Sequence, residues 1–231
     1  MIVWLASFPR SGNTFLRIAL HHLYGVRTSV VYDTDYVARR LGADLIGFTE
    51  RPAAIEAMRT DTRVHFVKTH RQVGHEVDPG DKAICLVRDG RDALVSWARQ
   101  VSEAEPGRFA AELRKMIVRD EPVGAGSWGA NVLSWLQPPV PNRLLLRYED
   151  LVGDPAYAVE RVVTALAPQL SPRAGAVIPS FADLQQVDDQ FFRRGRSSTH
   201  RDELPADLHE LFWSRPDNVA AMRLVGFPPT G

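Results

Sequence analysis

The sequence predicts an α/β fold built around a central parallel β-sheet flanked by helices. Two patterns carry this prediction: short runs of apolar residues, typical of strands buried on both faces, and longer stretches with apolar residues at helical spacing. The two patterns alternate along the chain, which favours parallel strands joined by helices. The predicted strands are residues 2–6, 64–67, 83–87 and 143–148, and the predicted helices are approximately 15–24, 91–101, 108–119, 127–136, 155–167 and 206–213.

The start of the chain shows both patterns in succession. Residues 2–6, IVWLA, form the first apolar run. After a polar turn, apolar side chains recur at helical spacing from Phe15 to Tyr24, and Gly25 is a common C-terminal stop for a helix. A strand, a turn and a helix are therefore expected here.

Polar side chains mark the end of each strand. The later runs VHFV, AICLV and RLLLRY all end in, or are followed by, charged or polar residues. Because the carboxyl ends of parallel strands share one edge of a sheet, these side chains should converge where α/β folds bind ligands. The converging groups are Ser7 to Thr14, Lys68 to His70, Arg88 with Asp89, and Tyr148 to Asp150.

Length and composition are those of one soluble globular domain. The chain has 231 residues, 45% of them apolar, and no repeat or low-complexity linker, so residues 1–231 are expected to form a single domain. Its 28 basic and 28 acidic residues cancel, which gives no global field for nucleic-acid binding. Any anion site must therefore come from local clustering.

Cysteine content and hydropathy indicate the cellular compartment that the sequence favours. Cys85 is the single cysteine, which leaves no internal disulfide and no cysteine metal cluster. The N-terminal residues do not resemble a signal peptide, and no apolar run reaches the length of a membrane span. We expect a cytoplasmic protein without an integral membrane segment.

The turn after the first strand has the composition of an anion site. In residues 7–17, SFPRSGNTFLR, a loop enters a helix whose unpaired backbone N–H groups and dipole favour an anion. Gly12 allows close approach of the backbone to a ligand. The alternative interpretation is a plain strand–turn–helix connection with Asn13 or Thr14 as N-cap. The stretch is not a Walker A sequence.

Two motifs in this chain resemble the nucleotide-binding motifs of the sulfotransferases, which use 3′-phosphoadenosine 5′-phosphosulfate (PAPS). The first is FPRSGNTF at 8–15, where the family reads roughly Tyr-Pro-Lys-Ser-Gly-Thr-Thr-Trp. The second is LVRDGRDALVSWARQ at 86–100, which has an Arg at a strand end and a Ser eight residues later, as the family does. Four further stretches agree in order: KTH at 68–70, GSW at 126–128 followed by Trp135, RYEDLVGDP at 147–155 and FFRRG at 191–195.

The chain departs from the family pattern in several places. Arg10 and Arg194 each replace a Lys, and Phe15 stands where the cytosolic animal enzymes stack a Trp on adenine. The chain is also shorter than those enzymes. Shortening is expected to trim loops that face the acceptor, so the acceptor is the property that can least be inferred from the family.

The resemblance implies a P-loop-like three-layer fold and an enzyme that moves a sulfuryl group from PAPS to an acceptor hydroxyl, or less readily an amine. The second product would be 3′-phosphoadenosine 5′-phosphate (PAP), and no metal would be needed. The implied acceptor is a small molecule or a group on a glycan, lipid or peptide scaffold. The sequence determines neither the acceptor nor the oligomeric state.

The resemblance also assigns roles to individual residues. The implied catalytic residues are His70 as general base, Lys68 on the sulfuryl oxygens and Arg10 on the leaving 5′-phosphate. The implied donor-binding residues are Arg10, Ser11, Gly12, Asn13 and Thr14 for the 5′-phosphate, Arg88, Ser96, Arg193, Arg194 and Gly195 for the 3′-phosphate, and Phe15, Tyr148 and Phe181 for adenine.

Each assignment has a structural alternative. His70 could be a satisfied histidine at a strand end, Lys68 a surface lysine, and Arg88 a partner of Asp89 or Asp92. The RRGR segment could be a solvated basic loop. The aromatic side chains could belong to the core, which is the first interpretation of Trp128 and Trp135 because they lie seven residues apart on one helix, with an acceptor wall second. Glu149 and Asp150 are better explained by a helix start and an ion pair than by a metal.

Two other functions stay open from the sequence. One is an ATP-dependent kinase of P-loop-like fold, which would need a metal-binding acid after a strand. The other is a catalytically silent nucleotide-binding domain, against which the presence of both Lys68 and His70 argues. Residues 28–62 and 101–127 are expected to shape the acceptor pocket.

Overall fold

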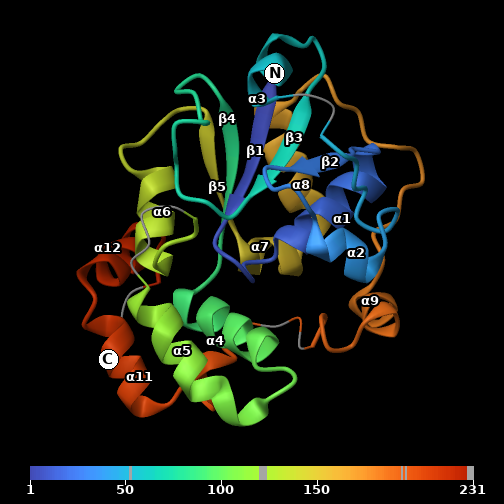
Figure 1. Cartoon of the computed structure of the whole chain (residues 1–231). Helices are drawn as coiled ribbons and strands as arrows, with labels where there is room; N and C mark the ends of the chain where they lie inside the picture. Colours follow the sequence, from blue (N-terminus) through green and yellow to red (C-terminus); the bar gives the residue numbers. More distant parts are fainter. Residues whose placement is uncertain (52–53, 120–123, 194, 196, 228–231) are drawn as a thin grey trace.

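Five parallel strands form the centre of the computed structural model, which describes residues 1–51, 54–119, 124–193, 195 and 197–227. In spatial order they are β2, β3, β1, β4 and β5 (Figure 1). Their bounds are β1 Ile2–Ser7, β2 Thr28–Val30, β3 His65–Thr69, β4 Lys82–Val87 and β5 Arg143–Arg147. After β1 the chain builds β2 and β3 on one side and then β4 and β5 on the other, so the strand order reverses at β1.

The alternation of side chains along the strands gives the sheet two apolar faces. On one face Val3 and Leu5 pack with helices α1 (Asn13–Tyr24) and α8 (Pro155–Leu166). On the other face Trp4 packs with Met58 of α3 (Ile55–Thr60) and Trp135 of α6 (Trp128–Leu136). Helices on both faces explain why the strands read as continuous apolar runs.

Further helices lie beyond the carboxyl ends of the strands (Figure 1). A helical cluster joins α4, α5, α11 and α12 to α6. A smaller cluster joins α2 and α9 to Ile18 of α1 and to Phe191 and Phe192. The bounds of the remaining helices are α2 Tyr36–Leu41, α4 Gly90–Val101, the 3₁₀ turn η1 Pro106–Arg108, α5 Phe109–Val118, α7 Tyr148–Gly153, α9 Phe181–Val187, α10 His200–Glu203, α11 Ala206–Trp213 and α12 Pro216–Leu224.

The predicted α/β class with a central parallel sheet is confirmed, with differences at the ends of elements. Lys68 and Thr69 are the last residues of β3 rather than the residues after it, and Tyr148 begins α7 rather than ending β5. The sequence pattern did not predict β2, α2, α3, α7, α9, α10 or α12. Most of these are short, and an element of three to seven residues is too short to show a convincing period.

A buried ion pair ties three of these elements together. Arg17 of α1 lies 2.7 Å from the carboxylate of Asp35, and both side chains are fully buried. The Arg17 Nε also donates to the Thr28 hydroxyl in β2 at 2.7 Å. Asp35 in turn accepts hydrogen bonds from two backbone N–H groups at the start of α2. The pair therefore fixes α2 against α1 and the sheet.

We predict that Arg17→Met destabilises the protein by about 3–5 kcal/mol, because it leaves the Asp35 carboxylate buried without its counter-charge. Urea unfolding measures the loss. Arg63→Met is the matched control, since Arg63 pairs with Asp61 at 2.7 Å but its side chain is 72% exposed, and this variant should unfold like the wild type. A double variant, Arg17→Met with Asp35→Leu, should recover part of the stability. Equal unfolding of all variants would contradict the prediction.

Candidate active site

A large cavity of about 1200 Å³ opens at the carboxyl ends of β1, β3 and β4. This is the edge at which the sequence predicts convergence, and it is where strand order reverses, the usual ligand site of open α/β sheets. The volume exceeds the common size of a small-molecule pocket.

The loop between β1 and α1 forms the floor of one end of the cavity. Gly12 has φ +98°, and a Cβ there would lie 2.6 Å from the Tyr148 ring, so both the backbone conformation and the close packing require glycine. Asn13 donates to the Leu5 carbonyl at 2.9 Å and to the Ser7 hydroxyl at 3.1 Å. The Asn13 side chain therefore holds the loop in shape.

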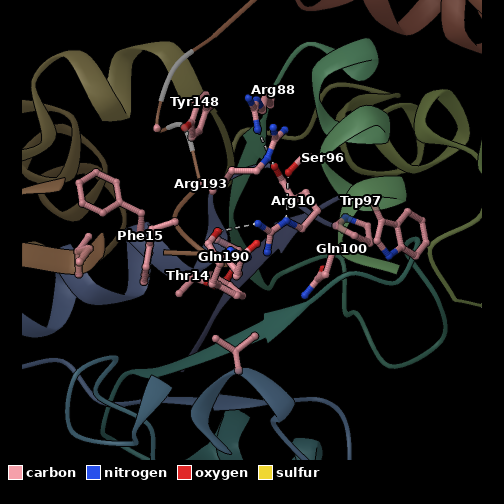
Figure 2. Close-up of a pocket in the computed structure, with 18 of the residues that line it drawn as sticks. Arg10, Thr14, Phe15, Arg88, Ser96, Trp97, Gln100, Tyr148, Gln190 and Arg193 are labelled. Carbon is pink, nitrogen blue, oxygen red and sulfur yellow. Dashed lines mark hydrogen bonds between the residues drawn. The ribbon is translucent and has the colours of Figure 1, made fainter. Parts of the chain in front are cut away.

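The guanidinium groups of Arg10, Arg88 and Arg193 lie close together at this end of the cavity (Figure 2). Arg10 donates through Nε to the Ser96 hydroxyl at 3.2 Å and through Nη2 to the Phe191 carbonyl at 3.0 Å. Burial, followed by the charges of Arg88, Arg40 and Arg193, lowers the pKa of Arg10 to about 10. An anion bound among these groups would relieve their mutual repulsion.

Arg88 joins the Arg10 loop to an aromatic side chain. Its Nη1 donates to the Arg10 carbonyl at 3.3 Å, and its guanidinium carbon lies 4.4 Å from the centre of the Tyr148 ring. Arg88 also lies 3.8 Å from Asp92, one turn along α4. The ion pair with Asp92 that the sequence left open as an alternative is present, and Arg88 nevertheless lines the cavity.

His70 follows β3 directly and has a defined tautomer. Its Nδ1 lies 2.8 Å from the backbone carbonyl of Ser7, which can only accept a hydrogen bond, so Nδ1 carries the proton and the lone pair is on Nε2. Burial, followed by the charge of Lys68, lowers the pKa of His70 to about 3. The imidazole is therefore neutral at physiological pH and has a nitrogen able to accept a proton.

Lys68 is the second-last residue of β3 and lines the cavity. It is buried, and its Nζ lies 5.8 Å from the centre of the Tyr32 ring. Burial lowers the pKa of Lys68 to about 8 against the opposing charge of Asp35. Lys68 is thus a mostly protonated ammonium group that has lost much of its hydration.

Helix α6 anchors the peptide that follows β3. Asn131 donates to the His70 carbonyl at 2.9 Å, and the Trp135 indole donates to the Arg71 carbonyl at 2.9 Å. Trp135 and Trp128 are both buried and line no part of the cavity among the described residues, in agreement with their interpretation as core. The anchors fix the backbone on which His70 sits.

The structure brings together most of the residues singled out in the sequence. The cavity is lined by Arg10, Gly12, Asn13, Thr14, Phe15, Lys68, His70, Arg88, Ser96, Tyr148, Phe181, Arg193 and Gly195. Ser11 is the exception: its side chain is fully buried and is not among the lining residues. Arg194 lies outside the described residues.

Aromatic side chains flank the guanidinium cluster. Phe15 and Tyr148 lie on the same side of the cavity in Figure 2. Gly195 has φ +56°, and a Cβ there would lie 2.4 Å from the Phe181 ring, so the backbone of Gly195 packs directly on that ring. The arrangement leaves flat apolar surface next to the positive cluster.

Several lining residues were not predicted. Tyr32, whose hydroxyl accepts from the His70 backbone N–H at 2.6 Å, and Arg71, Trp97, Gln100 and Phe191 all line the cavity. Tyr32 and Asp33 come from the segment 28–62, and Ser102 and Glu103 from 101–127, the two segments expected to shape the acceptor pocket. Trp97 follows Ser96 in the sequence, and this was the one hint in the sequence that Trp97 would line the cavity.

The acidic residues after β5 lie at a helix start and next to a basic side chain, as their structural interpretation expects, although among the described residues no side-chain hydrogen bond caps this helix. Glu149 and Asp150 lie in the first turn of α7, and Asp150 is 4.0 Å from Arg161. Burial raises the pKa of Glu149. Over the described ranges, no group of three or more His, Cys, Asp or Glu side chains is arranged to hold a metal ion.

The sulfotransferase domain family matches residues 2–179, and the chain belongs to this family. Among curated relatives, WSCD family member GA21586 of Drosophila pseudoobscura pseudoobscura is 32% identical over 157 residues, 66% of this chain and 46% of that protein. A 3-alpha-hydroxysteroid sulfotransferase of Cavia porcellus is 22% identical over 64% of this chain and 58% of its own length. The chain thus spans about half the length of the curated relatives it matches.

Two solved structures share the fold. Mouse sulfotransferase SULT7A1 complexed with PAP has a TM-score of 0.67 at 18% identity, covering 97% of this chain and 88% of that one. Retinol dehydratase in complex with androsterone and the inactive cofactor PAP has a TM-score of 0.60 at 18% identity, covering 96% and 80%. The P-loop-like α/β architecture expected from the sequence is therefore that of the sulfotransferases. In the part of the chain that the structure describes, no helix is long and apolar enough to cross a bilayer.

The protonation state of His70 yields a prediction about pH. The pKa of His70 is about 3 in the folded protein and about 6.5 when unfolded, so the unfolded chain binds the extra proton between these values and the folded state loses stability as pH falls through that window. Lowering pH from 7 to 5 should therefore cost the wild type about 1–2 kcal/mol more than His70→Asn in urea unfolding. Parallel losses in the two proteins would contradict a neutral His70.

Proposed function

We propose that this chain transfers a sulfuryl group from PAPS to an acceptor hydroxyl, or less readily an amine, by in-line displacement with His70 as general base. The observation that carries the proposal is the cluster of Arg10, Arg88 and Arg193 in one cavity with a neutral imidazole and a buried ammonium group. Membership in the sulfotransferase domain family supports it.

The residues present fit a nucleotide that carries phosphates at both ends. The backbone at the start of α1, which Gly12 leaves open, together with Arg10 and Thr14, would hold the 5′-phosphate. Arg88, Ser96 and Arg193 would bind the 3′-phosphate, for which Arg is well suited because its planar fork contacts two oxygens. Phe15, Tyr148 and Phe181 offer apolar surface for adenine. PAPS would supply the sulfuryl group.

His70 would accept the proton of the acceptor at Nε2. The Ser7 carbonyl holds Nδ1–H and would stabilise the imidazolium that forms. A pKa of about 3 is too low for an efficient base at neutral pH, but anionic ligands in the cavity would raise it by favouring the charged imidazole. The free protein thus keeps His70 neutral, and donor binding would prepare it for proton transfer.

Lys68 would neutralise charge on the sulfuryl oxygens, and Arg10 the charge that develops on the leaving phosphate. Lys68 is buried and Arg10 is half-buried, so their electrostatic effect is less screened by water than that of a surface cation. Electrostatic stabilisation by prearranged cations is the main contribution expected from a protein to this type of transfer.

The acceptor would enter on the side of Tyr32, Arg71 and Trp97, which combine aromatic surface with polar groups. A small molecule or an exposed group of a glycan, lipid or peptide scaffold fits this mixture. We further propose that residues 1–231 act as one sulfotransferase domain. Its cytoplasmic location and the acceptor remain predictions.

The first experiment compares three ligands by isothermal titration calorimetry: PAP, AMP without the 3′-phosphate, and ATP with Mg²⁺. We predict that PAP binds at least about tenfold more tightly than either, because charge-assisted hydrogen bonds to the 3′-phosphate are lost in the other two. ATP–Mg²⁺ binding as tightly as PAP would instead support a kinase.

The second experiment tests the base. His70→Asn should lower turnover about 10²–10⁴-fold and leave the PAP dissociation constant nearly unchanged, because the side chain accepts the proton without holding the donor. Turnover is measured as PAP release from PAPS with a phenol, a glycoside and a primary amine as acceptors. His65→Asn is the control, since His65 lies on the same strand at the opposite end and pairs with Asp61. Tight PAP binding without any turnover in the wild type would support a catalytically silent domain.

A further inference from the structure

Asp92 is a fully buried carboxylate on α4 that binds residues 198–200. Its Oδ1 accepts hydrogen bonds from the His200 backbone N–H at 2.8 Å, the His200 Nδ1 at 2.7 Å and the Thr199 hydroxyl at 3.3 Å. Its Oδ2 accepts from the Ser198 backbone N–H at 2.6 Å. The carboxylate thus joins residues that are more than a hundred positions apart in the sequence.

The segment that Asp92 holds has little stability of its own. Helix α10 contains four residues, which is too short for a helix to persist without tertiary contacts. Asp92 satisfies the backbone at its start, including the N–H group of Ser198, whose φ is +63°. The position of α10 therefore depends on this carboxylate.

The far end of α10 positions a guanidinium group of the cavity. Glu203, the last residue of α10, accepts from Arg193 at 3.0 Å and from Arg99 at 2.8 Å. Arg193 in turn lines the cavity next to Arg88 (Figure 2). A continuous set of contacts runs from Asp92 through α10 and Glu203 to Arg193.

The same carboxylate also faces the second cation of this end of the cavity. Arg88 lies 3.8 Å from the Asp92 Oδ2. Burial opposes ionisation of Asp92, but the hydrogen bonds from His200 and the charge of Arg88 outweigh it and lower the pKa of Asp92. Asp92 is therefore charged at neutral pH. It lies beside Arg88 and is linked to Arg193 through α10 and Glu203, but within the described residues it does not line the cavity itself.

We propose that Asp92 is the positioning residue that gives this site its preference for a 3′-phosphate, because it fixes Arg88 on one side and, through α10 and Glu203, Arg193 on the other. The inference rests on the proposed function, since it concerns the 3′-phosphate of PAPS and PAP. Asp92 acts through the two arginines and does not touch the ligand.

The test compares PAP and AMP binding to Asp92→Asn by calorimetry. The amide keeps the size of the side chain but loses the charge and one acceptor oxygen. We expect PAP affinity to fall at least about tenfold while AMP affinity stays within about twofold, because only PAP has the phosphate that the two arginines bind. Asp89→Asn is the matched control: Asp89 is also buried at the start of α4, but its carboxylate accepts hydrogen bonds from Arg91 instead.

A second variant keeps the proposal testable if Asp92→Asn does not fold. Glu203→Gln weakens the last link, to Arg193 and Arg99, and should lower PAP affinity several-fold without changing AMP affinity. Limited trypsin digestion gives a readout of the anchor itself, since cleavage after Arg201 in α10 should be faster in Asp92→Asn than in Asp89→Asn.

The outcomes separate this inference from the proposed function. A wild type that binds PAP and AMP equally would overturn the proposed function, and this inference with it. A wild type that prefers PAP, with the preference retained in Asp92→Asn and Glu203→Gln, would overturn the inference alone. Equal losses of PAP and AMP affinity in Asp92→Asn would reduce Asp92 to a general structural role and would also overturn it.

Discussion

Positive charge concentrated at one edge of the sheet is the constraint around which this molecule is organised. Arg10, Lys68 and Arg88 lie at the ends of three neighbouring strands and line the same cavity. Such crowding raises the free energy of the free protein. Two buried carboxylates outside the cavity wall offset part of this repulsion. The charge of Asp35 acts on Lys68, and Asp92 lies beside Arg88. A chain with no net charge can therefore present a cavity surface that is strongly positive, and an anionic ligand would complete the charge balance.

The sheet itself determines how His70 can react. The parallel register pairs Ala6 of β1 with Thr69 of β3, so Ser7 and His70 follow side by side. The Ser7 carbonyl then accepts the Nδ1 proton at 2.8 Å, and helix α6 holds the His70 carbonyl through Asn131. The tautomer is thus imposed by backbone geometry rather than by an acidic side chain. Because the position of a backbone carbonyl depends on strand register, the sheet also fixes the orientation of the imidazole.

The sequence predicted what depends on local pattern and missed what depends on long-range packing. Continuous apolar runs identified four of the five strands, and the polar residues that end them identified Arg10, His70 and Arg88. Strand β2 has three residues and is held by pairing with β3, so no local period reveals it. Asp92 could be named only as a possible partner of Arg88, because its four hydrogen bonds come from residues 106–108 positions later. Ser11 matched a motif, but its side chain turns away from the cavity into the core.

The two ends of the cavity differ in how far family membership informs their chemistry. The guanidinium end is built from short motifs at the ends of strands, where backbone geometry leaves few alternatives for the side chains. The rest of the cavity wall includes Tyr32 and Arg71, which lie outside these motifs. The curated relative with 32% identity matches this chain over 46% of its own length, so the match leaves more than half of that protein uncompared. The proposed donor site therefore rests on these motifs and on membership in the sulfotransferase domain family, whereas the acceptor has to be found by testing acceptors directly.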